Sequence, residues 1–337
     1  MLAHWLPLLA GILISGCSWN RIVEAPALPE PKAEQFSPAV RDRLQGAYQA
    51  ALAHPSDAGA VGRYGMVLQA HGQRESALSC YRSAQALAPG TFEWPYYLGV
   101  AAAELGDHHA ASSAFEQALK LRPGYLPARL RYADAVLESG GVSRSLELYQ
   151  SIVQDYPTLA TPLYGLGQAQ ERSGRTKQAA ESLQKALDLY PDYSAAQYAL
   201  AMVYRRLGDT QASNRLMERY ESSGKTAPPI EDPVLGAMRG LDASAQAHLR
   251  RSLELAAAGR LEEAAKANLA ALEINPKLVR AHVNLISLYG RLGREEEAAR
   301  HYHSAIEIQP GSPESHYNFG VMLVSAGRVD EGRAAFQ

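Results

Sequence analysis

The stretch that decides the fold runs from Phe92 to Pro123 and reads FEWPYYLGVAAAELGDHHAASSAFEQALKLRP. Apolar residues recur on either side of Gly106 and Asp107 at the spacing of an amphipathic helix. Gly106 and Asp107 themselves are typical of a tight turn, and Pro123 ends the second half. The stretch therefore predicts two short helices joined by a turn.

The same residue types return at a fixed distance along the chain. Five pairs of like residues are each separated by 34 positions: Gly65 and Gly99, Ala77 and Ala111, Tyr81 and Phe115, Ala84 and Ala118, and Pro89 and Pro123. Units of this kind begin near Ala58, Phe92, Leu126, Ala160, Ser194, Ala245, Val279 and Pro313. Matches that keep one register over most of the chain predict an internal repeat.

Two further columns of the repeat indicate how each unit is bounded. The turn of every unit carries a glycine, which suits a backbone with positive φ after a helix end: Gly72, Gly106, Gly140, Gly174, Gly208, Gly259, Gly293 and Gly327. Most second helices end at a proline, which cannot continue the helix: Pro89, Pro123, Pro157, Pro191, Pro276 and Pro310. Because isolated helices of about a dozen residues are marginal in water, each pair should be stable only against its neighbours.

This pattern resembles the tetratricopeptide repeat (TPR) family. The resemblance implies an all-α fold, a TPR α-solenoid in which about eight helix-turn-helix repeats form a superhelix in two blocks. Residues 38–225 are expected to form the first array, with five repeats after a leading helix that starts at Ser37 and Pro38. Residues 245–337 are expected to form the second array, with two full repeats and one truncated repeat. The eighth unit stops at Gln337 within its second helix, which favours a fragment of a longer protein.

The repeat decays between the two blocks. Ser213 and Ala264 occupy the same column but are 51 residues apart, which is one repeat plus an insertion of 17. Bulky Tyr220 replaces the small residue expected at its column, so no standard helix is expected to follow it. Residues 226–244 are rich in proline and are interpreted as a spacer or hinge. Its apolar residues Val234, Leu235, Met238 and Leu241 predict a short helix that docks on the array.

The N-terminus has the pattern of an exported, lipid-anchored protein. Residues 1–16 are mostly apolar but too short to remain as a membrane span, which indicates a signal peptide. Ile14 to Cys17 resembles the bacterial lipobox, which implies that Cys17 is lipidated, although no Lys or Arg precedes the apolar run. An ordinary signal peptide with an incidental cysteine is the alternative.

The lipobox resemblance also carries a location. It implies a protein of the bacterial cell envelope that faces the periplasm, anchored to the membrane through the lipid on Cys17. In the sorting pattern of enteric bacteria an Asp after the lipidated cysteine keeps the protein out of the outer membrane. This chain has Ser18 there, so the outer membrane is favoured by analogy. Residues 17–37 contain several prolines and are expected to form a tether that holds the array away from the membrane.

Composition and short motifs point away from several functions. A formal charge of −2 over 337 residues does not suggest a nucleic-acid partner. Ser223 to Thr226 resembles the end of a phosphate-binding loop, but Pro228 and Pro229 block the helix that should follow. Neighbouring histidines such as His108 and His109 diverge on a helix, so neither a metal nor a cofactor is expected. Neither a small-molecule substrate nor catalysis is expected, and Cys80 is expected to be a packed apolar residue.

The strongest functional signal lies on the first helices, which line the concave face in this family. Their inward stripe combines aromatic rings with charged groups, as peptide-binding surfaces do: Tyr96, Tyr164, Tyr198, Tyr317, Glu104, Glu138, Glu171, Arg172, Arg205, Arg206 and Arg291. The alternative is an ordinary solvated face with pairs inside each helix. The carboxylate clamp of chaperone-binding members is absent, because tyrosine or aliphatic residues stand at its Lys and Asn positions. Asn284 and Asn318 resemble the first-helix asparagine that grips peptide backbone in the TPR region of O-GlcNAc transferases.

These observations favour a non-catalytic, membrane-anchored scaffold whose groove binds protein partners or extended peptide segments, with envelope assembly or complex formation as its expected role. The alternative is the N-terminal recognition region of a larger enzyme, such as a glycosyltransferase or redox protein, with a catalytic domain beyond residue 337.

Overall fold

The computed structural model describes residues 27–222, 224 and 226–336, and the predicted signal peptide and Cys17 lie outside them. The described residues form the following helices: α1 Pro38–Ala53, α2 Ala58–Ala70, α3 Arg74–Leu87, α4 Glu93–Glu104, α5 His108–Leu121, α6 Leu126–Glu138, α7 Val142–Asp155, α8 Ala160–Arg172, α9 Thr176–Leu189, α10 Ser194–Arg206, α11 Thr210–Ser222, α12 Pro233–Arg239, α13 Ala245–Ala257, α14 Leu261–Ile274, α15 Val279–Arg291, α16 Glu295–Ile308, α17 Pro313–Ser325 and α18 Val329–Ala335. No strand is formed in this part of the chain, and an isolated bridge joins Tyr193 to Thr226. The predicted all-α fold is confirmed.

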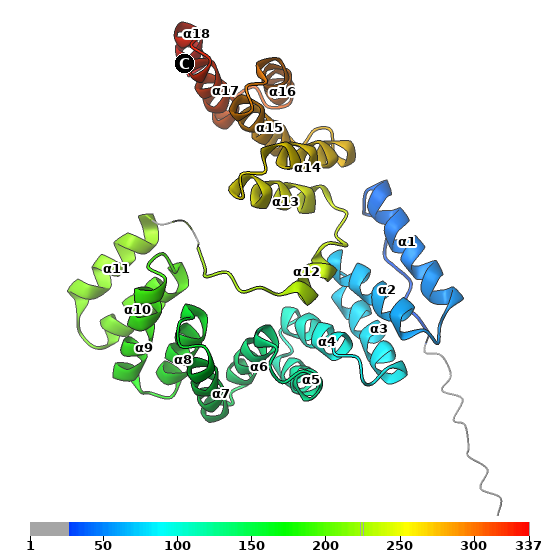
Figure 1. Cartoon of the computed structure of the whole chain (residues 1–337), viewed down its shortest axis with the longest axis vertical. Helices are drawn as coiled ribbons and strands as arrows, with labels where there is room; N and C mark the ends of the chain where they lie inside the picture. Colours follow the sequence, from blue (N-terminus) through cyan, green and yellow to red (C-terminus); the bar gives the residue numbers. More distant parts are fainter. Residues whose placement is uncertain (1–26, 223, 225, 337) are drawn as a thin grey trace, which may run out of the picture.

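The helices pack in consecutive antiparallel pairs, and α2 to α11 form an arc around a hollow (Figure 1). The first helix of each repeat begins at the predicted residue, except α4, which begins at Glu93 instead of Phe92. A second set of pairs, α13 to α18, continues beyond the spacer (Figure 1). None of the helices in the described residues is long and apolar enough to cross a membrane.

The turn glycines have the predicted backbone conformation. All eight have φ between 72° and 91°, and no other described residue type has positive φ. Glycines at the helix crossings have a different role, which is to let two helices pack closely. A Cβ on Gly99 would lie 2.6 Å from the ring of Phe115, so the two helices of that repeat can meet only at a glycine.

Prolines that end one repeat are linked to the next repeat by a recurring polar contact. Gln197 Nε2 donates to the carbonyl of Pro191 at 2.8 Å, and His282 Nε2 contacts that of Pro276 at 3.1 Å. The third case lies one repeat further on, where His316 Nε2 contacts the Pro310 carbonyl at 3.0 Å. These side chains give a hydrogen-bond partner to a carbonyl in the loop that joins the two repeats.

The described part of the predicted tether packs on the first repeat. Tyr64 donates its hydroxyl to the Pro29 carbonyl at 2.5 Å, and Lys32 exchanges backbone hydrogen bonds with the Gln73 side chain. Residues 27–36 therefore do not extend freely from the array. Helix α1 starts at Pro38 as expected, but the side chain of Ser37 makes no capping hydrogen bond.

The spacer returns through the hollow of the arc instead of continuing the solenoid (Figure 1). Thr226 pairs with the start of α10, because the Ser194 amide donates to its carbonyl at 3.2 Å. Ile230 then packs on the cluster of α6 and α7. Helix α12 docks near α2 and α4, with Leu235 and Met238 buried in the same apolar cluster as these helices. The short docked helix predicted for this segment is present.

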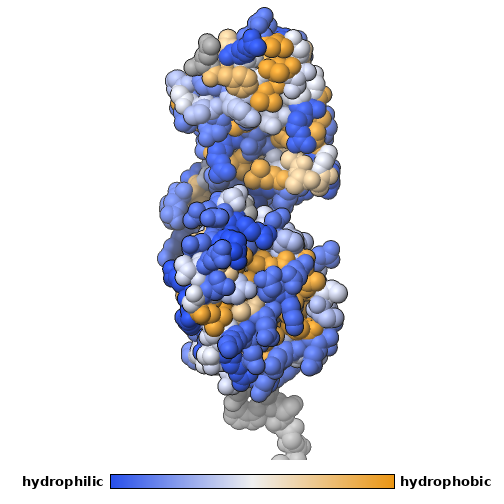
Figure 2. Space-filling model, turned by 90° about the vertical axis from the view of Figure 1, so that its left-hand side faces the viewer, coloured by the Kyte–Doolittle hydropathy of each residue, from blue (hydrophilic) through white to orange (hydrophobic). Residues whose placement is uncertain are grey.

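Asp242, just after α12, joins the spacer to both arrays. Its carboxylate lies 3.6 Å from His71 Nδ1 on the first array and 3.5 Å from Arg250 on α13. A narrow waist separates the second array from the first in the space-filling view (Figure 2). The two arrays therefore meet through the spacer and a small number of polar contacts.

Candidate functional site

A groove of about 530 Å³ lies between α8 and α10 at the end of the first array. First-helix residues supply most of its wall, and the second helices add one residue each: Tyr164, Gly167, Gln168, Glu171, Arg172, Ser194, Ala195, Tyr198, Ala199, Met202, Val203 and Arg206, with Leu183 from α9 and Tyr220 from α11. The groove combines aromatic rings, aliphatic side chains and ionic groups. We call this surface the terminal groove.

The terminal groove brings together five of the residues singled out from the sequence for the inward stripe. Tyr164, Tyr198, Arg172 and Arg206 all line it, and so does Glu171. Tyr198 is 47% exposed, which is unusual for a large ring at a repeat position. The repeat spacing therefore placed these residues on one surface.

The ionic groups of the terminal groove are paired between neighbouring repeats. Arg172 bonds to Glu138, and its Nη1 also donates to the Leu137 carbonyl at 3.1 Å. Arg206 bonds to Glu171. The other oxygen of Glu171, Oε2, is buried and has no hydrogen-bond partner among the described residues. Such an acceptor favours a ligand that brings an N–H or O–H group.

The groove is open because the repeat register breaks after α11. In a continuous solenoid the first helix of a sixth repeat would cover α10 and α11. Tyr220 belongs to α11, near the end of the last regular repeat, and its ring centroid is 5.5 Å from that of Tyr198. The bulky residue that ends the register thus forms one wall of the groove.

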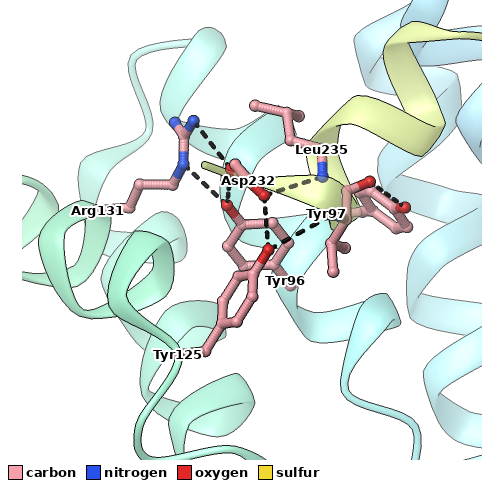
Figure 3. A network of polar contacts seen from close by, with 7 residues as sticks. Tyr96, Tyr97, Tyr125, Arg131, Asp232 and Leu235 are labelled. Atoms are coloured by element: carbon pink, nitrogen blue, oxygen red, sulfur yellow. Dashed lines mark hydrogen bonds and ion pairs between the residues drawn. The ribbon is translucent and has the colours of Figure 1, made fainter. Parts of the chain in front are cut away.

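The equivalent surface of the second and third repeats is filled by the spacer (Figure 3). Tyr96, predicted to contact a partner, is fully buried, and its hydroxyl donates to Asp232 Oδ2 at 2.5 Å. Tyr125 donates to Oδ1 of the same carboxylate at 2.8 Å, and Arg131 forms an ion pair with it at 3.6 Å. Tyr96 therefore contacts the chain's own spacer and is not accessible to a partner in this structure.

Burial and the Asp232 carboxylate both raise the pKa of Tyr125 in this network. Desolvation, followed by the hydrogen bond to Asp232, raises the pKa of Tyr125 to about 12. Tyr97 donates its hydroxyl to the Val234 carbonyl at 2.7 Å, which fixes the start of α12 (Figure 3). The tyrosines stay protonated and act as hydrogen-bond donors to the spacer.

Sequence reasoning missed Asp232, Tyr125 and Arg131. The local signal for Asp232 was present, because Asp followed by Pro is typical of a helix start. Its side chain indeed accepts from the Leu235 amide at 3.0 Å. Nothing in the sequence, however, indicated which surface this carboxylate would meet.

The remaining predicted residues lie apart from the terminal groove. Glu104 bonds to Arg74 at 2.7 Å, while Arg205 and Arg291 are exposed. Tyr317 is 62% exposed on α17. They do not line the terminal groove.

The two asparagines of the second array make internal contacts. Asn284 Nδ2 donates to Asn268 Oδ1 at 3.1 Å, and Asn268 bonds in turn to buried Ser252. Asn318 Nδ2 donates to the Val283 carbonyl at 3.4 Å. The amide nitrogens of both side chains are therefore engaged within the array.

Neither the cysteine nor the acidic and histidine residues of the described part suggest chemistry at a metal or thiol. No group of three His, Cys, Asp or Glu side chains that could hold a metal ion occurs among the described residues. Cys80 is fully buried, as expected, and burial raises the pKa of its thiol to about 12.

Several solved structures are similar to this chain. MamA from Desulfovibrio magneticus RS-1 is 23% identical, with a TM-score of 0.44 over 53% of this chain and 94% of MamA. PilF of Pseudomonas aeruginosa is 14% identical, with a TM-score of 0.43 over 80% of this chain and 96% of PilF. YrrB, described as a TPR protein with an unusual peptide-binding site, is 21% identical, with a TM-score of 0.32 over 61% and 97%. No curated protein matches the sequence at a significant level.

Family models agree with the repeats seen in the structure. One tetratricopeptide repeat model matches residues 63–125, 164–228 and 283–337, and a second matches residues 102–171. The first model alone spans more than half of the chain, and its matches fall on both arrays. The chain therefore belongs to the tetratricopeptide repeat family.

Proposed function

We propose that this chain is a non-catalytic scaffold that binds an extended peptide segment of a protein partner in the terminal groove. One observation carries the proposal: Tyr164, Tyr198, Arg172 and Arg206 converge on one open groove. On the second and third repeats the same face is already covered by the spacer. The terminal groove is the part of that face which remains for a partner.

The chemistry of the groove fits a polypeptide. Tyr164 and Tyr198 offer ring surface to an apolar side chain, at a small cost in conformational entropy. The unpartnered Glu171 Oε2 can accept a backbone N–H from an extended segment. A groove of about 530 Å³ holds a few side chains of such a segment, not a folded domain.

Residues 1–17 support the second part of the proposal, anchoring to a membrane of the bacterial envelope. The lipobox-like run from Ile14 to Cys17 follows an apolar segment of signal-peptide proportions. The scaffold would then face the periplasm from a lipid on Cys17, with the outer membrane favoured by Ser18. Cys17→Ala should move the protein to the soluble fraction. Retention in the membrane by native protein that carries no acyl chain would contradict the anchor.

The groove is tested by photo-crosslinking in intact cells, followed by purification and mass spectrometry of the captured partner. Tyr198→Ala removes a ring that is 47% exposed, so it should reduce capture at least tenfold while the melting temperature changes little. Leu189→Ala is the matched control, because Leu189 is 44% exposed in the fourth repeat but lies outside the groove lining.

Charge reversal gives an independent test of the same groove. Arg172→Glu combined with Arg206→Glu places like charges beside Glu138 and Glu171 and should abolish capture. Equal capture by the native chain, the Tyr198 variant and the charge-reversed variant would rule out the groove as the partner site.

A further inference from the structure

A second cleft, of about 850 Å³, lies where the two arrays meet the spacer. Its walls come from α2, α3 and the end of α4 in the first array, from α12 and the turn after it, and from α13 and the turn after it in the second array. We call it the junction cleft. It shares no lining residue with the terminal groove.

Arginine dominates the charges of the junction cleft. Five guanidinium groups and three carboxylates line it: Arg74, Arg239, Arg250, Arg251 and Arg260, with Glu104, Asp242 and Glu254. Arg74 belongs to the first array, whereas the other four arginines lie between residues 239 and 260, so the full set is assembled only in the folded chain. The whole chain has a formal charge of −2, so this positive surface is a local feature.

Two of these arginines have no carboxylate partner. Arg74 pairs with Glu104, Arg250 with Asp242 and Arg260 with Glu263. Arg239 and Arg251 form no ion pair within 4.0 Å in the described part of the chain. Both side chains belong to exposed residues, so their guanidinium groups remain available to a ligand.

The pKa of His248, which lines the junction cleft, is affected by these arginines. The pKa of His248 is lowered, first by burial and then by the neighbouring charge of Arg251. Asp242 and Glu273 act in the opposite direction and raise the pKa of His248, and Arg43 of α1 lowers it by a smaller amount. Arginines of both arrays therefore contribute to the electrostatic field at His248, together with two carboxylates.

The walls of the junction cleft are held by contacts that need no ligand. Asp232 and Tyr96 fix α12, and Met238 of α12 is 4% exposed against the first array. Asp242 then contacts His71 on one side and Arg250 on the other. A ligand would meet cleft walls whose helices are already held in place, which reduces the entropic cost of binding.

We propose that the junction cleft binds an acidic polypeptide segment of a partner protein, with Arg239 and Arg251 as its carboxylate-binding residues. The planar guanidinium group matches a carboxylate with two parallel hydrogen bonds. Because Glu104, Asp242 and Glu254 lie among five arginines, the net positive charge of the lining is small, which suits the few carboxylates of a short acidic segment better than the dense phosphates of a nucleic acid. This inference does not depend on the proposed role of the terminal groove.

Fluorescence anisotropy at low ionic strength tests the proposal, with fluorescein-labelled hexaglutamate as the probe. Hexaglutamine has the same length without charge, and hexathymidylate presents phosphates instead of carboxylates. The test variant is Arg239→Glu with Arg251→Glu. The matched control is Arg82→Glu with Arg215→Glu, which changes the net charge equally at exposed arginines outside the cleft.

We expect hexaglutamate to bind the native chain and hexaglutamine not to bind. The Arg239 and Arg251 variant should weaken binding at least tenfold, while the control variant changes it less than twofold. Equal weakening by both variants would show attraction to the whole surface and overturn the site. Hexathymidylate that binds more tightly than hexaglutamate with the same dependence on the two arginines would overturn the assignment to a polypeptide. Unaltered binding by the test variant would overturn the proposal outright.

Discussion

Two tyrosine pairs at equivalent repeat positions have different surroundings. Tyr96 and Tyr125 lie at the same repeat positions as Tyr164 and Tyr193, which are two repeats, or 68 residues, further along the chain. The ring centroids of the two pairs are 5.6 and 5.0 Å apart. The first pair binds a spacer carboxylate, whereas Tyr164 of the second pair accepts from Gln168 Nε2 at 2.7 Å and lines an open groove.

The neighbouring charges account for the difference. Arg131 attracts Asp232 to the first pair, and two repeats later the equivalent residue is Ala199. The charge of Asp134 raises the pKa of Tyr164, after the larger effect of burial. The second pair therefore lies in a more negative environment that does not favour a carboxylate. One repeat geometry thus supports two kinds of contact, and Arg131 is a charge that distinguishes the first from the second.

Removing the Asp232 carboxylate should have the largest effect on stability, because both Tyr96 and Tyr125 donate hydrogen bonds to it. Asp232→Ala leaves two tyrosine hydroxyls and Arg131 without their acceptor, and α12 without its N-cap. We expect the first array to lose about 2–4 kcal/mol of unfolding free energy. Denaturant unfolding monitored by circular dichroism measures this loss.

Glu231→Ala is the control for that measurement, because this neighbouring carboxylate is exposed. It should change the unfolding free energy by less than about 0.5 kcal/mol. Equal losses in both variants would mean that the network around Asp232 does not hold the spacer.

A larger side chain at one helix crossing of the first array tests whether the two arrays lose stability independently. Ala111 is fully buried on α5, so Ala111→Leu should cost about 1–3 kcal/mol. In a solenoid each repeat contacts its neighbours, so the damage should remain in the first array. Hydrogen exchange resolved by peptide would contradict this if α13 to α16 lost protection to the same extent as α4 to α7.

A pH change should affect the second array instead. Burial, followed by the charges of His282 and Arg300, lowers the pKa of His301 to about 4 from its usual 6.5. Between these pH values the unfolded chain binds more protons, so stability falls as the pH decreases through this range and is fully present above it. The Nδ1 atom of His301 also lies 3.0 Å from Nδ1 of His282, and this hydrogen bond is lost when both nitrogens carry a proton.

We expect a loss on the order of 1–2 kcal/mol between pH 6.5 and 4, reduced from the full linkage value because His301 is only half buried. His301→Gln should remove this part of the pH dependence, and exposed His303→Gln should not. Thermal melts across the range would contradict the account if both variants kept the native pH profile.

The smallest effect should come from the ion pairs of the terminal groove. Arg206 pairs with Glu171, but its side chain is 66% exposed. Arg206→Gln should therefore change the unfolding free energy by less than about 0.5 kcal/mol. A larger loss, measured by denaturant unfolding, would show that the groove arginines serve the fold and not a partner.

The repeat architecture was predictable because it depends on local rules. Glycines at φ near 80° and small residues at helix crossings are visible in the sequence as columns of one period, and Gly99 beside Phe115 is an example. The same period placed Tyr164 and Tyr198 on one face. The fate of Tyr96 was not predictable, because Asp232 approaches from 136 residues away and no repeat column encodes that contact.

The central claim is that the spacer closes the first array from within and leaves the terminal groove to a partner. Native-state hydrogen exchange of α12 tests it most directly, because a free helix of seven residues would not be stable in water. We predict that the amides of Gly236 and Gly240, which bond to the Asp232 and Gly236 carbonyls, exchange at least a hundredfold more slowly than in an unstructured peptide and lose this protection in Asp232→Ala. Exchange of these amides at the unstructured rate in the native chain would contradict the account.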